Sequence, residues 1–138
     1  MFSRTTEYAI RALTFLAAQP PGKLSGAREI AGAERIPMPF LWKILQRLSR
    51  QGLIRSFRGV RGGYELARPP FRISIDAILK GMGSTELATA CVLGLPKCRG
   101  NHRCPLHPVW DKTRDSMTRA LRTTSLADLA VWSKDHRK

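Results

Sequence analysis

Residues 36–68, IPMPFLWKILQRLSRQGLIRSFRGVRGGYELAR, decide the fold that we expect for this chain. Pro37 stands where a helix would begin, and proline suits the first turn because its φ already has a helical value. Five apolar residues then recur at the helical period and make one stripe: Phe40, Leu41, Ile44, Leu45 and Leu48. Gly52 follows, and glycine ends helices because it adopts the left-handed conformation without steric cost. The stretch therefore predicts one amphipathic helix over residues 37–51.

Two short β-prone runs, residues 53–58 and 64–67, follow this helix. They are separated by the loop GVRGG at residues 59–63, whose glycines allow positive φ and therefore a tight turn. A helix with a basic outer face, followed at once by a hairpin with arginines at its tip, is the arrangement of a winged helix-turn-helix. A core helix beside a solvated hairpin would explain any one of the basic residues. It does not explain a helix, a glycine stop and an arginine-bearing loop in this order.

The charge of the chain points to an anionic partner. Among 138 residues, Lys and Arg number 24 against 10 Asp and Glu, which gives a net charge of +14. Such an excess favours nucleic acid or an anionic lipid surface. The sequence has no apolar run of the roughly 18 residues that a membrane helix needs. Glu7 and Arg11 interrupt the apolar pattern near the N-terminus, which is unlike a signal peptide. We therefore expect a cytoplasmic protein that binds nucleic acid and no membrane.

Helices are also expected before the deciding stretch. Ser3 can cap a first helix that runs to about Gln19, and a short second helix begins at Ser25 or Gly26. The second helix and the helix over residues 37–51 form the helix-turn-helix pair, in which the latter is the recognition helix. The expected fold class is mainly α with a small β-wing.

A long helix over residues 108–122 is expected after a short one that Ser74 caps. Apolar and small residues share one stripe on it: Leu106, Val109, Trp110, Thr113, Met117, Ala120 and Leu121. The small winged domain does not need this stripe to close its core, so the stripe can pack against a second copy of the chain. Folding back on the chain's own core is an equal alternative. Ser125, with Asp128 three residues later, starts a final short helix.

All three cysteines lie in one segment before the long helix: Cys91, Cys98 and Cys104, with His107 three residues after the last. An odd number of cysteines in a reducing compartment argues against a disulfide framework and favours metal or redox chemistry. Thiolates favour zinc, cuprous ions or iron–sulfur clusters, and this wide spacing leaves zinc and iron–sulfur open. Three free thiols in a surface loop would be a liability with no gain in packing.

The chain resembles the Rrf2 family of winged-helix regulators, in its iron–sulfur-binding branch of the IscR, NsrR and RirA types. The resemblance covers nearly the whole length. Beside the cysteine segment, it is carried by TTEYAIRAL (5–13), AREIA (27–31), FLWKILQRL (40–48), RGVRGGYELAR (58–68), ISIDAIL (73–79) and SLADL (125–129). The loop string of residues 58–68 and the cysteine segment together make it highly specific.

This resemblance implies a 2Fe–2S or 4Fe–4S cluster held by the three cysteines. It also implies one of two fourth ligands. One group of the family uses a histidine that two residues separate from the third cysteine, which matches His107. Another uses a carboxylate on the first helix, which matches Glu7 and would come from the partner chain of a dimer. The first cysteine gap is six residues where the family usually has five, so Cys91 is the ligand that departs from the family pattern.

We therefore expect a homodimeric transcriptional regulator, a repressor, that binds a roughly palindromic double-stranded DNA operator. Its cluster would sense nitric oxide, iron, cluster supply or redox state. Residues 1–83 would form the winged domain, residues 84–107 the cluster-binding loop, and residues 108–138 the dimerisation helix with a short C-terminal helix. The residues expected at DNA are Arg28, Pro39, Trp42, Lys43, Gln46, Arg47, Arg50, Arg58 and Arg61.

Other functions are weighed against this one. A zinc-binding or cluster-free regulator would keep the DNA-binding residues, whereas a small redox carrier would not need a basic helix and wing. A general nucleic-acid packaging protein would lack a preferred operator. An enzyme is not expected, because the sequence contains no Ser/His/Asp arrangement and no paired carboxylates of a catalytic kind.

Overall fold

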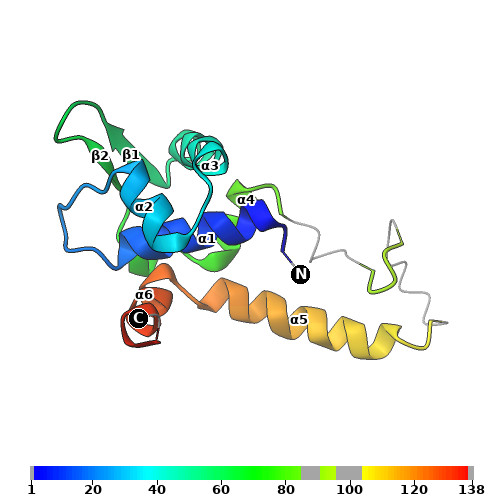
Figure 1. Cartoon of the computed structure of the whole chain (residues 1–138). Helices are drawn as coiled ribbons and strands as arrows, with labels where there is room; N and C mark the ends of the chain where they lie inside the picture. The colour runs from blue at the N-terminus through cyan, green and yellow to red at the C-terminus, as the bar shows by residue number, and fades with distance from the viewer. Residues whose placement is uncertain (1, 85–90, 96–103, 137–138) are drawn as a thin grey trace.

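The computed structural model of the 138-residue chain describes residues 2–84, 91–95 and 104–136. Figure 1 shows its helical body, from which a β-hairpin and one long helix project. The elements in chain order are α1 (Arg4–Ala17), α2 (Ala27–Glu34), α3 (Met38–Arg50), β1 (Ile54–Phe57), β2 (Gly63–Leu66), the 3-10 helix η1 (Pro70–Arg72), α4 (Ile75–Gly81), α5 (His107–Thr123) and α6 (Leu126–His136). The prediction of a mainly helical chain with a small β-wing is confirmed.

Helix α1 lies at the centre of the body and contacts α2, α3, α4, α6 and β2. Ser3 caps it as predicted, because its hydroxyl accepts from the backbone N–H of Thr6 at 3.1 Å. Neighbours on several sides bury most of its circumference: Thr6 and Thr14 are buried along with Leu13 and Leu16, and Ile10 is partly buried.

Helices α2 and α3 form the predicted helix-turn-helix pair. Arg35 adopts a left-handed conformation with φ of 54° at the end of α2, and the N–H of Ile36 donates to the carbonyl of Ala31 at 3.0 Å. This sharp turn brings α3 across the body with its apolar stripe inward, so that Leu41 and Leu48 are fully buried. The N–H of Gly52 then donates to Ser49, which confirms the predicted glycine stop.

The predicted place of Phe40 in the buried stripe of α3 is wrong. Its side chain is 54% exposed, while the other four residues of that stripe are buried. Phe40 lies in the first turn of α3, where its ring stands 6.4 Å from the ring of Tyr8 at a tilt of 55°. It therefore lies against α1 at the edge of the body, because the core narrows at that end of the helix.

The hairpin pairs β1 with β2 antiparallel, with Ile54 opposite Leu66 and Phe57 opposite Gly63. Ser25 extends this small sheet through an antiparallel bridge to Tyr64, with N–O distances of 3.0 and 2.8 Å. The sequence does not predict this bridge, because a single paired residue has no period. It ties the wing to the segment before α2.

Helices α4 and α6 begin with the predicted caps. Ser74 accepts from the N–H of Ala77 at 3.1 Å, and Ser125 and Asp128 bond reciprocally, backbone to side chain, at 2.9 and 3.2 Å. A bridge between Ser74 and Ser125 joins the two starts. Helix α6 continues to His136. No helix in the described part of the chain is long and apolar enough to cross a membrane.

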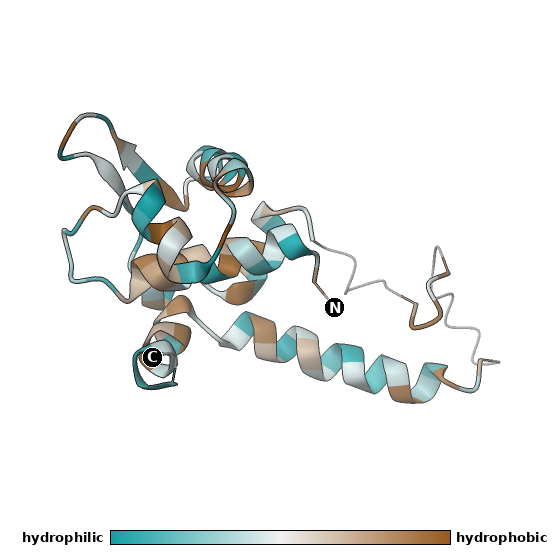
Figure 2. Cartoon of the chain, viewed as in Figure 1, coloured by the Kyte–Doolittle hydropathy of each residue, from teal (hydrophilic) through white to brown (hydrophobic). Residues whose placement is uncertain are grey.

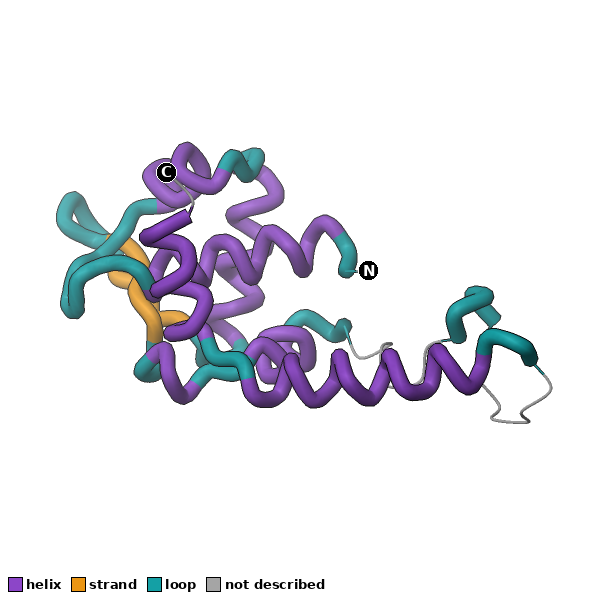
Figure 3. The backbone as a smooth tube through the Cα atoms, turned by 90° about the horizontal axis from the view of Figure 1, so that it is seen from below, coloured by secondary structure: helices purple, strands orange, loops and turns teal. Residues whose placement is uncertain are grey.

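Helix α5 leaves the body and runs alongside it for only part of its length (Figures 1 and 3). Its C-terminal end packs on the core through Leu121, but Val109 is 69% exposed and Leu106, just before the helix, is 49% exposed. The hydropathy colouring in Figure 2 shows apolar residues recurring along α5. Of the seven stripe residues, Leu106, Val109, Thr113 and Ala120 are exposed in the described part of the chain, and Trp110, Met117 and Leu121 are partly buried. Part of the stripe therefore packs on its own chain, and part of it is exposed.

The wing approaches the backbone of Ser25 so closely at position 63 that only glycine fits there without strain. Gly63 has φ of 150°, and a Cβ atom there would lie 2.8 Å from the backbone carbonyl oxygen of Ser25. Gly63→Ala should therefore destabilise the protein by about 1–3 kcal/mol, the usual cost of overpacking. Urea unfolding followed by circular dichroism measures this.

Gly32→Ala is the matched control, because no atom lies within 4 Å of a Cβ at that helical position. Alanine should leave stability unchanged or raise it by up to about 1 kcal/mol through helix propensity. A Gly63→Ala protein that unfolds at the wild-type urea concentration would contradict the close approach of the wing to Ser25.

Candidate nucleic-acid interface and cysteine segment

The outer face of α3 is polar, basic and exposed. Burying the apolar stripe turns the remaining positions outward, and Trp42 is 48% exposed there. The exposed members of the predicted DNA set on this helix are Pro39, Trp42, Lys43, Gln46, Arg47 and Arg50. Arg28 is exposed on the preceding helix α2. The structure thus gathers the predicted helical residues on the helix-turn-helix pair.

A hollow flanks α3 on each side. One, of about 420 Å³, separates α3 from the hairpin and is lined by Leu45, Gln46, Ser49, Arg50, Ser56 and Tyr64. The other, of about 300 Å³, lies towards α1 and α4 and is lined by Thr5, Phe40, Lys43, Ile44, Gln46, Arg47, Arg50 and Met82. Gln46 and Arg50 line both hollows, so they form the crest between them. A helix that enters a DNA major groove needs room on both sides for the two sugar-phosphate strands. The crest of α3 between its two hollows has this shape.

Sequence reasoning missed the hollow-lining residues that come from other elements. Ser56 and Tyr64 belong to the two strands, and Thr5 and Met82 come from α1 and the end of α4. Burial raises the pKa of Tyr64 above its ordinary value, so its hydroxyl stays protonated and able to donate a hydrogen bond. Of these residues, only Tyr64 could have been found from the sequence, because it lies in the string RGGYEL directly after the wing loop.

The wing tip is a tight turn in which the N–H of Gly62 donates to the carbonyl of Gly59 at 3.0 Å. Val60 and Arg61 occupy the two central positions; Val60 is fully exposed, and Arg61 is exposed. A Cβ at position 62 would lie 2.1 Å from the carbonyl oxygen of Phe57, so the turn requires glycine there. Arg58 and Arg61 are exposed and close together in sequence, as predicted.

The cations of this surface are free to meet an external anion. Among the described residues, Lys43, Arg50, Arg58 and Arg61 form no ion pair. Arg55, lower on the hairpin, is instead paired with Glu65 across the strands at 3.2 Å. Unpaired positive charge on one face attracts the phosphates of nucleic acid and releases their counterions.

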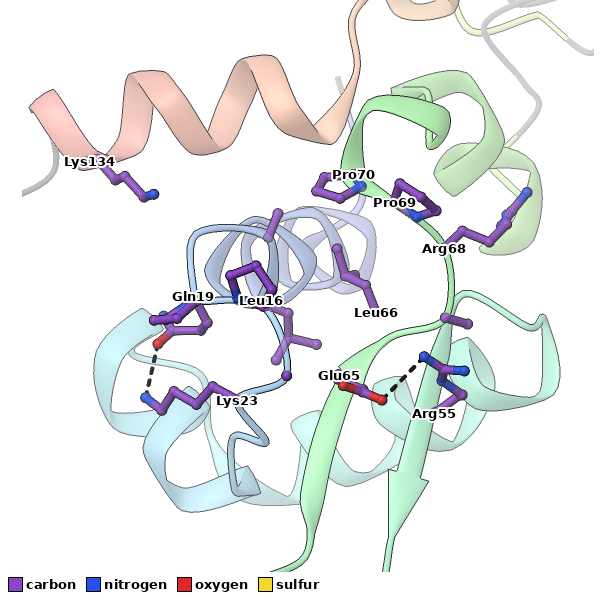
Figure 4. Close-up of a pocket in the computed structure, with 15 residues that line it drawn as sticks. Leu16, Gln19, Lys23, Arg55, Glu65, Leu66, Arg68, Pro69, Pro70 and Lys134 are labelled. Atoms are coloured by element: carbon purple, nitrogen blue, oxygen red, sulfur yellow. Dashed lines mark hydrogen bonds and ion pairs between the residues drawn. The ribbon is translucent and has the colours of Figure 1, made fainter.

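A third hollow, of about 510 Å³, lies at the base of the hairpin, where the end of α1, the strands and α6 meet (Figure 4). Its carboxylate, Glu65, points to Arg55, and Lys23 donates to Gln19 at 2.9 Å. Pro20, Pro69 and Pro70 form much of the remaining wall. The residues described in this hollow include no nucleophile beside a base and no paired carboxylates, so we assign no chemistry to it.

The cysteine segment is described in part. Cys91 and Cys104 are half-buried free thiols, while the predicted ligand Cys98 lies outside the described residues. The N–H of His107 donates to the carbonyl of Cys104 at 3.1 Å, and the His107 side chain is buried at the first position of α5. Glu7, the other predicted fourth ligand, is exposed in the first turn of α1.

Two thiols and an imidazole make a donor set that suits zinc or an iron–sulfur cluster. Among the described residues, no group of three or more His, Cys, Asp or Glu side chains lies close enough together to hold a metal ion. The donor types fit a metal centre, although the described residues do not bring three donors together; Cys98 is not among them. Neither His107 nor Glu7 is selected as the fourth ligand.

Comparison with known proteins agrees with the fold and with the predicted resemblance. A family model named Rrf2 and described as an iron-dependent transcriptional regulator matches residues 2–131. A putative helix-turn-helix transcriptional regulator of Mycobacterium tuberculosis is 40% identical over 129 residues, covering 93% of this chain and 80% of that protein. The transcriptional regulator NsrR of Halalkalibacterium halodurans is 33% identical, covering 90% of this chain and 86% of the relative.

Solved structures share the architecture. CymR of B. subtilis, described as the global cysteine regulator, superposes with a TM-score of 0.79 at 22% identity. The match covers 96% of this chain and 97% of that one. At this identity the likeness shows the fold alone.

Proposed function

Because the chain belongs to the Rrf2 family of transcriptional regulators and has its DNA-binding fold, we propose that it is a sequence-specific repressor controlled by an iron–sulfur cluster. The family consists of transcriptional regulators rather than enzymes. The observation that carries the DNA-binding part of the proposal is the exposed crest of α3 between two hollows. Beside it lies the wing tip, whose arginines form no ion pair with any residue that the structure describes. Such a protein acts in the cytoplasm, where the DNA is accessible.

On DNA, α3 would enter the major groove. Gln46 can bond an adenine edge in a bidentate manner, and Lys43 can donate to guanine. Arg58 and Arg61 at the wing would meet phosphates or the minor groove beside it. Arg28 on α2 is exposed and would contact the sugar-phosphate backbone of the same DNA site. Phosphate contacts set position and affinity, and base contacts set sequence preference.

The proposed cluster would be held by Cys91, Cys98 and Cys104, with His107 or Glu7 as fourth ligand and with 2Fe–2S or 4Fe–4S composition. The description of the family as iron-dependent supports iron over zinc. When bound, the cluster supplies a centre that is lost, oxidised or nitrosylated as iron supply, redox state or nitric oxide changes. His107 is buried at the start of α5, so a ligand there would connect the centre directly to that helix.

A regulator that works without a cluster is the second candidate. It is favoured by the absence of a three-ligand group among the described residues and by the similarity of fold to a protein described as a cysteine regulator. This candidate keeps every DNA contact and differs only in the signal. Metal analysis separates the two.

We also propose that the chain works as a homodimer through α5. Leu106 and Val109, at the N-terminal end of the stripe, are exposed in the described part of the chain, and a second copy supplies the same two residues. Dimers with twofold symmetry bind roughly palindromic sites whose half-sites lie about one helical turn apart. The N-terminal end of α5, beside Cys104, would then lie near the subunit boundary.

Two substitutions separate the proposed DNA contacts. Arg61→Ala should weaken binding to all sequences alike and lower the salt dependence by about one unit, because one phosphate contact is lost. Gln46→Ala should instead narrow the gap between operator and random DNA by about 1–3 kcal/mol. Fluorescence anisotropy with both kinds of duplex at several salt concentrations measures these effects.

Arg55→Ala is the charge-matched control, because Arg55 lies on the hairpin but pairs with Glu65. It should change affinity and salt dependence less than Arg61→Ala does. An Arg61→Ala protein with wild-type affinity and salt dependence would mean that the wing does not touch DNA.

The cluster is tested by anaerobic purification with iron, sulfide and zinc analysis. Cys98→Ala or Cys104→Ala should abolish the visible absorbance of the cluster. The helical circular dichroism should remain, because the buried core contains neither residue among its described members. A wild-type protein that binds one zinc and no iron would contradict the cluster and favour the second candidate.

His107→Ala and Glu7→Ala should then differ. We expect His107→Ala to lose or destabilise the cluster and Glu7→Ala to leave its spectrum unchanged. The opposite result would assign the fourth ligand to α1, and in a dimer it would make the cluster a bridge between subunits.

The dimer is tested by a charge in the apolar stripe of α5. Val109→Lys should convert the dimer to a monomer, because burying an unpaired ammonium in an apolar interface is costly. Asp115→Lys is the control, since Asp115 lies exposed on the opposite side of α5. Sedimentation velocity gives the mass of both variants. If Val109→Lys sediments as the wild type does, α5 does not form the interface.

A further inference from the structure

The end of α4 contacts the recognition helix through one arginine. The Nε–H of Arg47 on α3 donates to the carbonyl oxygen of Gly81, the last residue of α4, at 3.2 Å. Carbonyls at a helix C-terminus carry partial negative charge, so this oxygen is a favourable partner for a guanidinium. The approach is close, since a Cβ on Gly83 would lie 3.0 Å from Nη2 of Arg47.

The end of α4 is itself held in one conformation. Gly83 adopts φ of +71°, its N–H donates to Lys80, and the N–H of Ser84 donates to the carbonyl of Leu79 at 2.8 Å. These two bonds form a Schellman motif, which fixes the direction of the last carbonyls. These bonds hold the carbonyls of Leu79 and Lys80, directly before Gly81, so Ser84 takes part in fixing the last turn of α4, which carries the Gly81 oxygen.

Ser84 is bound in turn to α1. Its hydroxyl oxygen lies 2.6 Å from that of Thr6, which is 1% exposed. The hydroxyl of Ser3 donates to Thr6 at 3.0 Å, and in the bond between Thr6 and Ser84 either hydroxyl can be the donor. Hydrogen bonds thus connect the cap of α1 to Thr6 and Thr6 to the end of α4. The end of α4 is in turn bonded to Arg47 on the face of α3.

We propose that Thr6 and the end of α4 position Arg47 to bind a DNA phosphate. The bond to Gly81 uses only Nε–H, so the other four N–H groups of the guanidinium remain for an anion. Arg47 lines the hollow of about 300 Å³ beside α3, on the flank where a sugar-phosphate strand would lie. An arginine already held in place loses less side-chain entropy when it binds.

This inference rests on the proposed function and adds regulation to it. Ser84 is the point from which the chain continues towards Cys91. A displacement of Ser84 would move the Gly81 carbonyl and with it Arg47. The Thr6–Ser84 bond is therefore the place where a rearrangement beyond α4 reaches the DNA-binding face, and Thr6 acts as a positioning residue that touches no DNA itself.

A double-mutant cycle tests the proposal. The probe is a duplex selected from a random pool by the wild-type protein, and its affinity is measured at several salt concentrations. Thr6→Val should weaken binding about fivefold, the worth of one hydrogen bond, and should lower the salt dependence as Arg47→Ala does. In the Arg47→Ala background, Thr6→Val should have no further effect.

Two controls separate positioning from a general loss of structure. Thr6→Ser keeps the hydroxyl and should restore wild-type affinity. Thr6→Val combined with Arg61→Ala should be additive, because Arg61 lies on the distant wing. Thermal unfolding of each variant shows whether it is folded at the assay temperature.

Additive losses for Thr6→Val and Arg47→Ala would overturn the inference and leave the proposed function in place. Wild-type affinity in a folded Thr6→Val protein would overturn it too. A wild-type protein that selects no duplex from the pool would overturn both the inference and the proposed function.

Discussion

The burial of α1 in the middle of the body is the constraint on which the other elements depend. Ala9, Ala12 and Leu13 have no exposed surface, and the small side chains let several helices and a strand approach one axis. Helix α3 packs its apolar stripe against α1, α2 and β1. Its polar side therefore faces outward. The same helix supports the end of α4 through Thr6. The surface offered to DNA is thus a consequence of how one central helix is covered.

The positive charge of the chain favours an anionic partner. With a net charge of +14, the folded chain repels itself, and the described ion pairs lie away from the crest of α3 and the wing tip. Phosphates relieve this repulsion by neutralising cations and releasing their own counterions. In the proposed complex, the exposed Arg50 and Arg61 would be among the cations that phosphates neutralise. Their positions are fixed by α3 and by the glycine turn.

Local signals in the sequence determined where the elements begin and end. Ser3, Ser74 and the Ser125–Asp128 pair cap their helices, and Gly52 ends the recognition helix. These predictions succeed because each cap is a bond between residues within a few positions of one another. The order of helix, hairpin and projecting helix follows from them, and with it the winged fold.

The tertiary structure alone decided which residues from distant elements meet. The exposure of Phe40, the bridge from Ser25 to Tyr64 and the bond from Arg47 to Gly81 join or separate segments up to 39 positions apart in sequence. Periodicity within one helix cannot fix such contacts, because they depend on how each helix is rotated and crossed against its neighbours. The sequence by itself determined the elements and the charge of their outer faces. Only the packing of the elements around α1 determined the crest of α3, the two hollows beside it and the contacts from other elements that support them.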